Sequence, residues 1–317
     1  MTELSFVTPA RNEAAHIATL IQSIRTHVPA GCSHEIIVVD NASSDATAMI
    51  ARNLGARVLE VADGHIGALR NRGASVARGR VLAFLDADIE LTPGWGRRLP
   101  EVLAELAHDH RRITGSHTRP PHDGSWIERY WFANLHRGRR VARYLGSAHM
   151  IMQRSWFQEL GGFDETLTTG EDYDLCTRAR MAGGTVVDDA ALDAIHHGFP
   201  GRLSDFIRRE AWHGSSDWAD WRSIRQSRVA LATLGFAGLH VAMLALLLPG
   251  PFRDIGVAAI LMVAGLVTGS AMMRFRGCGP HTVLINAAVF YFYYAGRLLG
   301  AMRRIQRLCP GPATSTS

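Results

Sequence analysis

Short apolar runs alternate with stretches of helical periodicity over the first 110 residues of the chain. Uninterrupted apolar runs bounded by polar residues are typical of buried strands, and apolar residues at intervals of three and four predict helices. The runs predict strands at Leu4–Thr8, Glu35–Asp40, Ala56–Val61 and Arg80–Leu85, and the periodic stretches predict helices at Ile17–Val28, Asp45–Leu54 and Ala68–Ala77. Continuous apolar strands separated by helices indicate an α/β fold with a mostly parallel sheet, covered on both faces.

Residues 112–200 show a mixed pattern. Short strands are expected at Ile113–His117, Ser147–Met152 and Thr185–Asp189, with helices around Trp126–Leu135 and Glu171–Met181. We expect this part to complete the sheet and to shape a second pocket.

The last third of the chain carries the longest apolar segments. Val229–Leu248 has 20 residues without a charge and Ile255–Met273 has 19, and about 20 apolar residues span a bilayer as a helix. A third run, Val283–Gly296, has 14 residues before Arg297. The sequence therefore predicts two spans, at about 229–248 and 255–273. A third hydrophobic segment, 283–302, is predicted either to span the membrane or, as we prefer, to lie at its interface.

The distribution of charge predicts how the apolar segments are oriented in the membrane. From Gly201 onward the chain has 13 arginines and 5 acidic residues, whereas the first 200 residues have a net charge of −3. Basic charge beside apolar runs favours a membrane surface and not nucleic acid as the partner. Arginines 222, 225 and 228 precede the first span, and arginines 274 and 276 follow the second. The positive-inside rule then places both ends of this hairpin in the cytoplasm.

These patterns divide the chain into a domain at 1–215, an interfacial linker at 216–228 and a membrane region at 229–308. The four cysteines lack metal-site spacing and are expected to be reduced thiols. The first residues lack the basic and apolar regions of a signal peptide. We therefore expect a multi-pass protein of the inner (cell) membrane, with its first domain in the cytoplasm.

Polar side chains follow three of the predicted strands. Residues 8–12 follow the first strand, Asp40 ends the second, and Asp86 and Asp88 follow the fourth. In parallel sheets, ligands bind outside the carboxyl ends of the strands. The Asp-Ala-Asp triplet alone could be an ordinary strand end, but its neighbours favour a ligand site.

Six segments occur in an order that resembles family 2 glycosyltransferases of the GT-A fold. They are FVTPARNEAAHI, EIIVVDNASSDAT, GALRNRG, FLDADIELTPGW, GGFDE and GEDYDLCTRARMAG, and they lie within residues 4–215. The resemblance implies a Rossmann-like GT-A catalytic domain that uses a nucleotide-sugar donor and a divalent cation, Mg²⁺ or Mn²⁺.

The resemblance also implies roles for particular residues. The metal would be held by Asp88, with His197 as a tentative further ligand. The implied nucleotide-sugar residues are Pro9, Arg11, Asn12, Glu13, Asp40, Arg70, Asp86 and Ala87. Asp172 would be the general base that takes a proton from the acceptor hydroxyl in an inverting transfer. Gly162, Glu171 and Trp212 are expected on the acceptor side.

The chain departs from processive synthases, because it lacks their QxxRW motif and has few predicted spans. We therefore expect a non-processive enzyme that adds one sugar to a glycan or lipid-linked acceptor at the cytoplasmic membrane face, for cell-surface or exopolysaccharide assembly. Two alternatives stay open: a polyprenyl-phosphate glycosyltransferase and a catalytically silent GT-A scaffold subunit. A nucleotidyltransferase could share the sheet and the Asp pair, but it would not be expected to show the GGFDE and GEDYDL segments.

Overall fold

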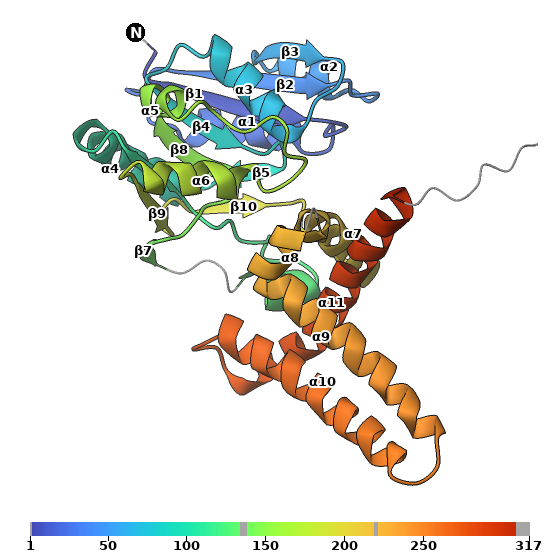
Figure 1. Ribbon diagram of the computed structural model, residues 1–317. Coiled ribbons are helices and arrows are strands. Elements are labelled where there is room, and N and C mark those ends of the chain that lie inside the picture. Colours follow the sequence, from blue (N-terminus) through green and yellow to red (C-terminus); the bar gives the residue numbers. More distant parts are fainter. Residues whose placement is uncertain (1, 134–137, 219–220, 309–317) are drawn as a thin grey trace, which may run out of the picture. The chain divides into compact units, whose positions relative to one another are not determined.

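The computed structural model describes residues 2–133, 138–218 and 221–308, and the chain forms two compact units (Figure 1). The sheet unit comprises Met1–His122 and Leu135–Phe199, and the helical unit comprises Asp123–Asn134 and Pro200–Ser317. The predicted domain boundary at residue 215 differs from this division. Residues 200–215 and the segment Asp123–Asn134 both belong to the helical unit.

The sheet unit is built on an eight-stranded mixed sheet with the order β3-β2-β1-β4-β8-β6-β9-β7. Its strands are β1 (Leu4–Ala10), β2 (His34–Asn41), β3 (Arg57–Val61), β4 (Val81–Leu85), β6 (Arg112–Gly115), β7 (Arg139–Val141), β8 (His149–Gln153) and β9 (Thr185–Asp189). The first four strands are parallel, and β8 runs antiparallel to both β4 and β6. A separate two-stranded sheet pairs β5 (Ile89–Leu91) with β10 (Ala194–His196).

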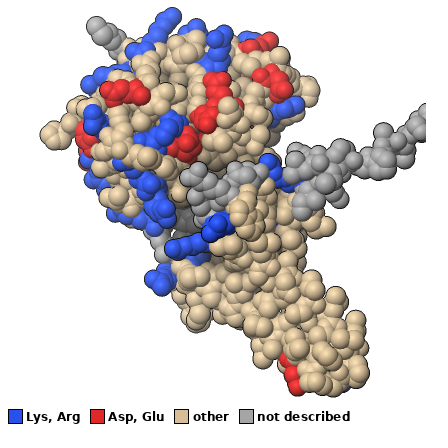
Figure 2. Space-filling model, viewed as in Figure 1, with Lys and Arg blue, Asp and Glu red and all other residues tan. Residues whose placement is uncertain are grey.

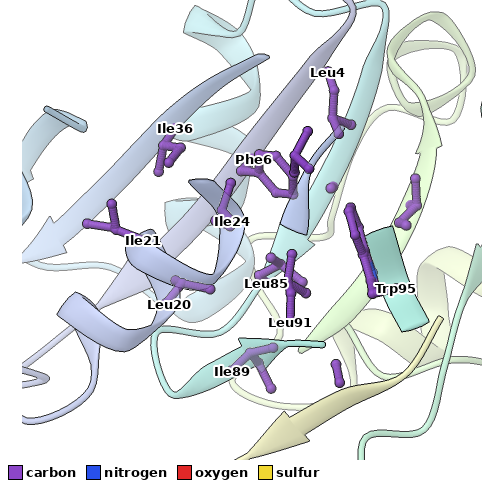
Figure 3. Packing of buried hydrophobic residues seen from close by; sticks show 14 of the residues in the cluster. Leu4, Phe6, Leu20, Ile21, Ile24, Ile36, Leu85, Ile89, Leu91 and Trp95 are labelled. Carbon is purple, nitrogen blue, oxygen red and sulfur yellow. The ribbon is translucent and has the colours of Figure 1, made fainter. Parts of the chain in front are cut away.

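Helices cover both faces of the sheet. They are α1 (Ile17–His27), α2 (Thr47–Asn53), α3 (Ile66–Val76), α4 (Pro93–His108), α5 (Arg154–Glu159) and α6 (Glu171–Met181). Successive residues of a strand face opposite sides, and this alternation separates two cores. Leu4 and Phe6 of β1 pack with α1 and Trp95 of α4 (Figure 3), whereas Val7 packs on the other face with residues of α3, α5 and α6.

Gly73 allows α3 to lie close to the sheet. A β-carbon at this position would stand 2.4 Å from Cγ1 of Val7, well inside van der Waals contact. A larger side chain would therefore push α3 away from β1. This matters for function because α3 carries Arg70, one of the predicted nucleotide-sugar residues.

The helical unit comprises a π-helix η1 (Glu128–Phe132), α7 (Leu203–His213), two 3₁₀ turns η3 (Gly214–Trp218) and η4 (Leu244–Leu247), α8 (Trp221–Gln226), α9 (Arg228–Met243), α10 (Phe252–Arg274) and α11 (Pro280–Leu308). Trp131 of η1 is 1% exposed, and its ring contacts Phe206 of α7 and Phe290 and Tyr293 of α11. The segment from the middle of the chain is thus part of the core of this unit.

α7 and α11 approach each other closely. A β-carbon on Gly296 would stand 3.0 Å from the carbonyl oxygen of Ile207, and one on Gly300 would stand 2.5 Å from that of Ala211. Between these glycines, Arg297 pairs with Glu210 at 3.0 Å and Asp217 at 3.1 Å. Small residues and a buried ion pair therefore fix the contact between the two helices.

Three helical segments are long and apolar enough to cross a membrane: Arg228–Leu247, Phe252–Arg274 and Pro280–Arg304. On the visible face, the α9–α10 hairpin shows almost no charge, whereas arginine and acidic side chains crowd the sheet unit (Figure 2). Exposed large apolar side chains of the hairpin include Leu231, Leu234, Val241, Leu244, Leu247, Phe252, Ile255, Ile260, Leu261 and Met262. Such a surface suits a lipid environment.

The sequence-based fold class is confirmed: a mostly parallel α/β sheet is followed by apolar helices. All seven predicted strands form, with shifts of a few residues at their ends. The helix predicted around Trp126–Leu135 contains η1, and its last residues lie outside the described part of the chain. Residues 219–220 of the predicted linker also lie outside it.

Candidate active site

The site begins at the carboxyl ends of β1 and β2, where two loops are joined by hydrogen bonds. Asn12 and Ala42 have positive φ angles of 56° and 48°. The Asn12 N–H donates to Oγ of Ser43 at 2.9 Å, and Oδ1 of Asn12 accepts from the Ser44 N–H at 2.8 Å. The Glu13 N–H donates to Oγ1 of Thr47 at 2.7 Å. These bonds hold the predicted nucleotide loop in one conformation.

Asp40, near the end of β2, is 3% exposed. Its Oδ2 accepts from the Ser43 N–H at 3.1 Å, while Oδ1 is buried without a hydrogen-bond partner in the described part of the chain. Oδ1 of Asn41 and Oγ1 of Thr8 are likewise buried without a hydrogen-bond partner among the described residues. Buried polar atoms rarely stay without partners, so this group fits a ligand that brings hydrogen-bond donors.

The predicted nucleotide residues of the first loop have different surroundings. Pro9 is a buried residue of β1, and Arg11 and Asn12 are exposed just after that strand. Burial, followed by the negative charges of Asp88, Asp86 and Asp45, raises the pKa of Glu13 to about 7. Glu13 therefore faces the acidic side of the site, next to the Asp-Ala-Asp segment.

Asp86 and Asp88 follow β4, with buried Ala87 between them. Asp86 accepts from Nη2 of Arg70 at 2.6 Å. Oδ2 of Asp88 lies 3.1 Å from Nε2 of His196. Burial alone would raise the pKa of Asp88, but the hydrogen bond and charge of His196 outweigh it and hold this pKa below its ordinary value. The two carboxylates thus have separate partners, Arg70 for Asp86 and His196 for Asp88.

β10 determines which histidine reaches Asp88. It runs antiparallel to β5, with His196 opposite Ile89, and the following His197 N–H donates to the Asp88 carbonyl at 2.9 Å. Adjacent residues of a strand point to opposite sides. His196 accordingly contacts the Asp88 carboxylate, whereas Nε2 of the predicted ligand His197 lies 2.7 Å from Glu90.

The surroundings of Asp88 suit a small cation. Its Oδ1 is buried without a partner in the described part of the chain. Gly198 leaves the carboxylate open, because a β-carbon there would stand 1.8 Å from Oδ2. Carboxylate oxygen and imidazole nitrogen are both ligands of Mn²⁺. Within the described residues, no group of three or more His, Cys, Asp or Glu side chains forms a complete metal site. Any cation bound here needs further ligands, such as the oxygens of a diphosphate.

Arg70 is 1% exposed and lies between two carboxylates. Nη1 donates to Glu171 at 2.8 Å, and Nη2 donates to Asp86 at 2.6 Å. The sequence interpretation made Arg70 a donor-contacting residue and Glu171 an acceptor-side residue. In the structure Arg70 pairs with both Glu171 and Asp86 and so links the end of β4 to the start of α6. The predicted donor and acceptor roles stay predictions.

Asp172 lies in the first turn of α6, which follows Gly170 at a φ of 85°. Its Oδ1 accepts from the Tyr173 N–H at 2.7 Å, and the Ser147 backbone also donates to its carboxylate. A helix N-terminus favours a charged carboxylate. Here burial, followed by the charge of Glu171, outweighs that effect and raises the pKa of Asp172 to about 6. A carboxylate with this pKa is a stronger base than an ordinary Asp.

Gly162 and Trp212, both expected on the acceptor side, lie in different units. Gly162 has a φ of 73°, and a β-carbon there would stand 2.7 Å from Oδ1 of Asn71. Asn71 holds the same loop by accepting from the Phe163 N–H at 2.9 Å and donating to the Phe163 carbonyl at 2.8 Å. Trp212 is 51% exposed on α7 of the helical unit. Gly162 therefore shapes the loop next to α3 and α6.

A mixed α/β sheet with an Asp-x-Asp pair after β4 and an acidic helix start on α6 defines the GT-A class of fold. The chain belongs to the family 2 glycosyltransferases: the model of Glycosyl transferase family group 2 matches residues 123–292, and that of Glycosyl transferase family 2 matches residues 5–161.

Two relatives in sequence are also glycan-related proteins. The chain is 27% identical over 303 residues to a pre-mycofactocin glycosyltransferase of Mycobacterium tuberculosis, covering 90% of this chain and 61% of the relative. It is 30% identical over 230 residues to the succinoglycan biosynthesis protein ExoO of Rhizobium meliloti, covering 65% of this chain and 64% of the relative. The chain thus spans less than two thirds of the length of these relatives.

Two solved structures share the fold. A mannosyltransferase from Pyrobaculum calidifontis in complex with GDP-Man and Mn²⁺ has a TM-score of 0.61 at 17% identity, covering 96% of this chain and 87% of its own. The TarS 1–349 structure from S. aureus in complex with UDP-GlcNAc has a TM-score of 0.50 at 15% identity, covering 95% of this chain and 92% of its own.

Proposed function

We propose that the protein is a metal-dependent, inverting glycosyltransferase that transfers one sugar from a nucleotide-sugar donor to a hydroxyl of an acceptor at a membrane. The observation that carries the proposal is the buried link Asp86–Arg70–Glu171, which fixes the Asp-Ala-Asp segment next to the helix start that holds Asp172. Family membership supports the transfer of a sugar.

The donor would occupy the carboxyl ends of β1, β2 and β4. The unpartnered Oδ1 of Asp40 would accept an N–H from the nucleotide base, and the preformed loop at Asn12 would line the base and ribose. Solved structures of the same fold hold GDP-Man or UDP-GlcNAc, which supports a nucleotide-sugar donor.

A divalent cation would neutralise the diphosphate as it leaves, which is a recognised role of metals in catalysis. We propose Asp88 as its ligand and His196 as the neighbouring imidazole, since their side chains are in contact. His197, the residue expected from the sequence, stays a candidate that a substitution can test. The solved mannosyltransferase structure, which shares the fold, contains Mn²⁺.

Asp172 would accept the proton of the acceptor hydroxyl as that oxygen attacks the sugar carbon. Its raised pKa improves its basicity while leaving most of it ionised at pH 7. Arg70 opposes the charge of Glu171 beside it, so that the base is not surrounded only by negative charge. Of Arg70, Glu171 and Asp172, we propose only Asp172 as the general base.

The apolar helices support a membrane location, and the arginines that flank them favour a multi-pass arrangement in the inner membrane with the sheet unit in the cytoplasm. An acceptor carried by a membrane lipid would be within reach of an enzyme held there. The proposal includes a role in cell-surface or exopolysaccharide assembly, which the similarity to a succinoglycan biosynthesis protein supports.

Thermal unfolding with a panel of UDP-, GDP- and dTDP-sugars tests donor binding. A ligand at 100 times its Kd stabilises a protein by about 2.7 kcal/mol, which corresponds to a shift of roughly 5–10 °C for a domain of this size. We expect such a shift from one nucleotide class with Mn²⁺. Asp88→Asn should lose the Mn²⁺-dependent part, and the exposed Glu159→Gln on α5 should keep it. The proposal is wrong if no nucleotide sugar raises the unfolding temperature.

Incubation of membranes with radiolabelled donor then tests the acceptor. We expect label in a product that already carries sugar. Label transferred to bare polyprenyl phosphate alone would instead identify a polyprenyl-phosphate glycosyltransferase. Binding of donor without any transfer, by a protein with intact Asp172, would favour the silent scaffold.

A further inference from the structure

Two tyrosines of the sheet unit are exposed and in contact with each other. Tyr144 is 43% exposed and Tyr173 is 46% exposed, and their ring centroids are 5.6 Å apart at an interplanar angle of 68°. The other exposed large apolar residues in the described part of this unit, Met49, Val141 and Met181, are not aromatic. Two adjoining aromatic rings exposed at one place form a small apolar surface that a ligand could cover.

Both tyrosines adjoin the proposed base. Tyr173 directly follows Asp172 and donates its backbone N–H to that carboxylate at 2.7 Å. Tyr144 begins a short segment that ends at Ser147, whose backbone donates to Asp172 and whose hydroxyl donates to Glu171 at 2.9 Å. In the same segment, a β-carbon on Gly146 would stand 3.8 Å from Oδ2 of Asp172. The two aromatic rings therefore come from the two chain segments that hold the carboxylate.

We propose that Tyr144 and Tyr173 form a platform on which a pyranose ring of the acceptor stacks. The proposal rests on the proposed function, in which Asp172 takes the proton of an acceptor hydroxyl. A general base works within about 3 Å of the proton it removes, so the ring that carries the hydroxyl, or the ring next to it, must lie beside the carboxylate. The tyrosine pair provides an exposed apolar surface beside this carboxylate.

The chemistry of the pair suits a sugar ring. One face of a pyranose presents several C–H groups, and these pack on the electron-rich face of an aromatic ring. The tyrosine hydroxyls add polar groups that can bond to sugar hydroxyls.

The surroundings of the pair argue against a lipid chain. Arg143, next to Tyr144, is exposed, and Asp174, next to Tyr173, is paired with Arg178. An isoprenoid chain would need a longer continuous apolar surface than two rings among charged residues. A patch of this size, bordered by charge, matches a single sugar ring.

Saturation-transfer NMR with simple glycosides tests the platform on the full chain in a detergent without a sugar head group. The probes are the methyl glycosides of glucose, galactose, mannose and N-acetylglucosamine. At least one should receive saturation from the wild-type protein, strongest at the C–H protons of one ring face. Tyr173→Ala and Tyr144→Ala should each weaken binding about five- to tenfold, as expected for loss of an aromatic contact. Tyr173→Phe should keep most of it.

Met181→Ala is the matched control, because Met181 is 83% exposed at the far end of the same helix, α6. It should leave the glycoside signal unchanged. Equal signals from the wild type and both alanine variants would overturn the proposal, and so would the absence of a signal from all four glycosides. The experiment needs no donor and no turnover. Its failure is therefore distinct from failure of the nucleotide-sugar panel, which would refute the transfer reaction itself.

Discussion

Replacing Arg70 with methionine should destabilise the sheet unit strongly, because it leaves a buried carboxylate without its counter-charge. Arg70 is 1% exposed and the Glu171 side chain 8% exposed. Without the guanidinium, the Glu171 carboxylate keeps one hydrogen bond within the described part of the chain, from the Ser147 hydroxyl. Breaking a buried ion pair by removing one partner costs about 3–5 kcal/mol. The Asp86 side chain is 27% exposed, so water compensates for much of the lost interaction between Asp86 and Arg70. We therefore expect a cost near the lower end, about 3 kcal/mol.

The measurement is thermal unfolding of the full chain in detergent, followed by tryptophan fluorescence at one fixed scan rate. About 3 kcal/mol corresponds to a decrease of roughly 6–12 °C for a domain of this size. Arg72→Met provides the matched control, since Arg72 is exposed on the same helix, α3. It should change the unfolding temperature by less than about 2 °C.

The double variant Arg70→Met, Glu171→Gln tests the cause. Removing the carboxylate charge together with its partner should restore part of the loss, because the buried uncompensated charge is then absent. A decrease of under about 2 °C in the single variant, or simple additivity in the double variant, would refute the idea of a coupled buried pair.

Four further predictions concern catalysis, metal binding and packing. Asp172→Asn should lower kcat by about 10²–10⁴ while leaving donor stabilisation in thermal unfolding, and equal kcat would exclude Asp172 as the base. Since the base must be ionised and its pKa is raised to about 6, the wild-type kcat should fall as the pH drops below about 6, and a pH–rate profile that is flat down to pH 4.5 would contradict this. His196→Ala should weaken the Mn²⁺-dependent stabilisation by donor more than His197→Ala does, and the reverse order in the thermal-shift assay would support the residue chosen from the sequence. Gly73→Ala should destabilise the protein by about 1–3 kcal/mol in chemical denaturation because its β-carbon meets Val7, and an unchanged midpoint would show that α3 shifts freely.

Much of the sheet unit could be predicted because its strands are buried on both faces. Residues such as Leu82, Ala83 and Phe84 form an uninterrupted apolar run, which is a strong local signal. β5 and β10 have three residues each and pair across about 100 positions, so no local periodicity reveals them. That pairing decides which histidine reaches Asp88, and this explains why the sequence alone could not choose between His196 and His197.

The spacing of residues in α3 already indicated that Arg70 is buried. Gly67, Arg70 and Ala74 are spaced by three and four residues and share the buried face of α3. An arginine on such a face needs a buried carboxylate partner. The sequence could thus indicate that Arg70 is paired inside the protein, but not that its partners are Asp86 and Glu171, which lie 16 and 101 positions away.

The placement of Trp131 in the core of the helical unit has a consequence for dividing the protein. The chain passes between the two units three times, near residues 122, 135 and 199. A protease that cuts once between Phe199 and Arg202 would therefore leave two fragments still held together by η1, whose Trp131 packs against Phe206, Phe290 and Tyr293. For the same reason, a shortened protein that ends at residue 199 would expose Trp131 and Phe132 to water. A soluble form of the sheet unit requires a polar replacement of residues 123–134 as well as removal of the membrane helices.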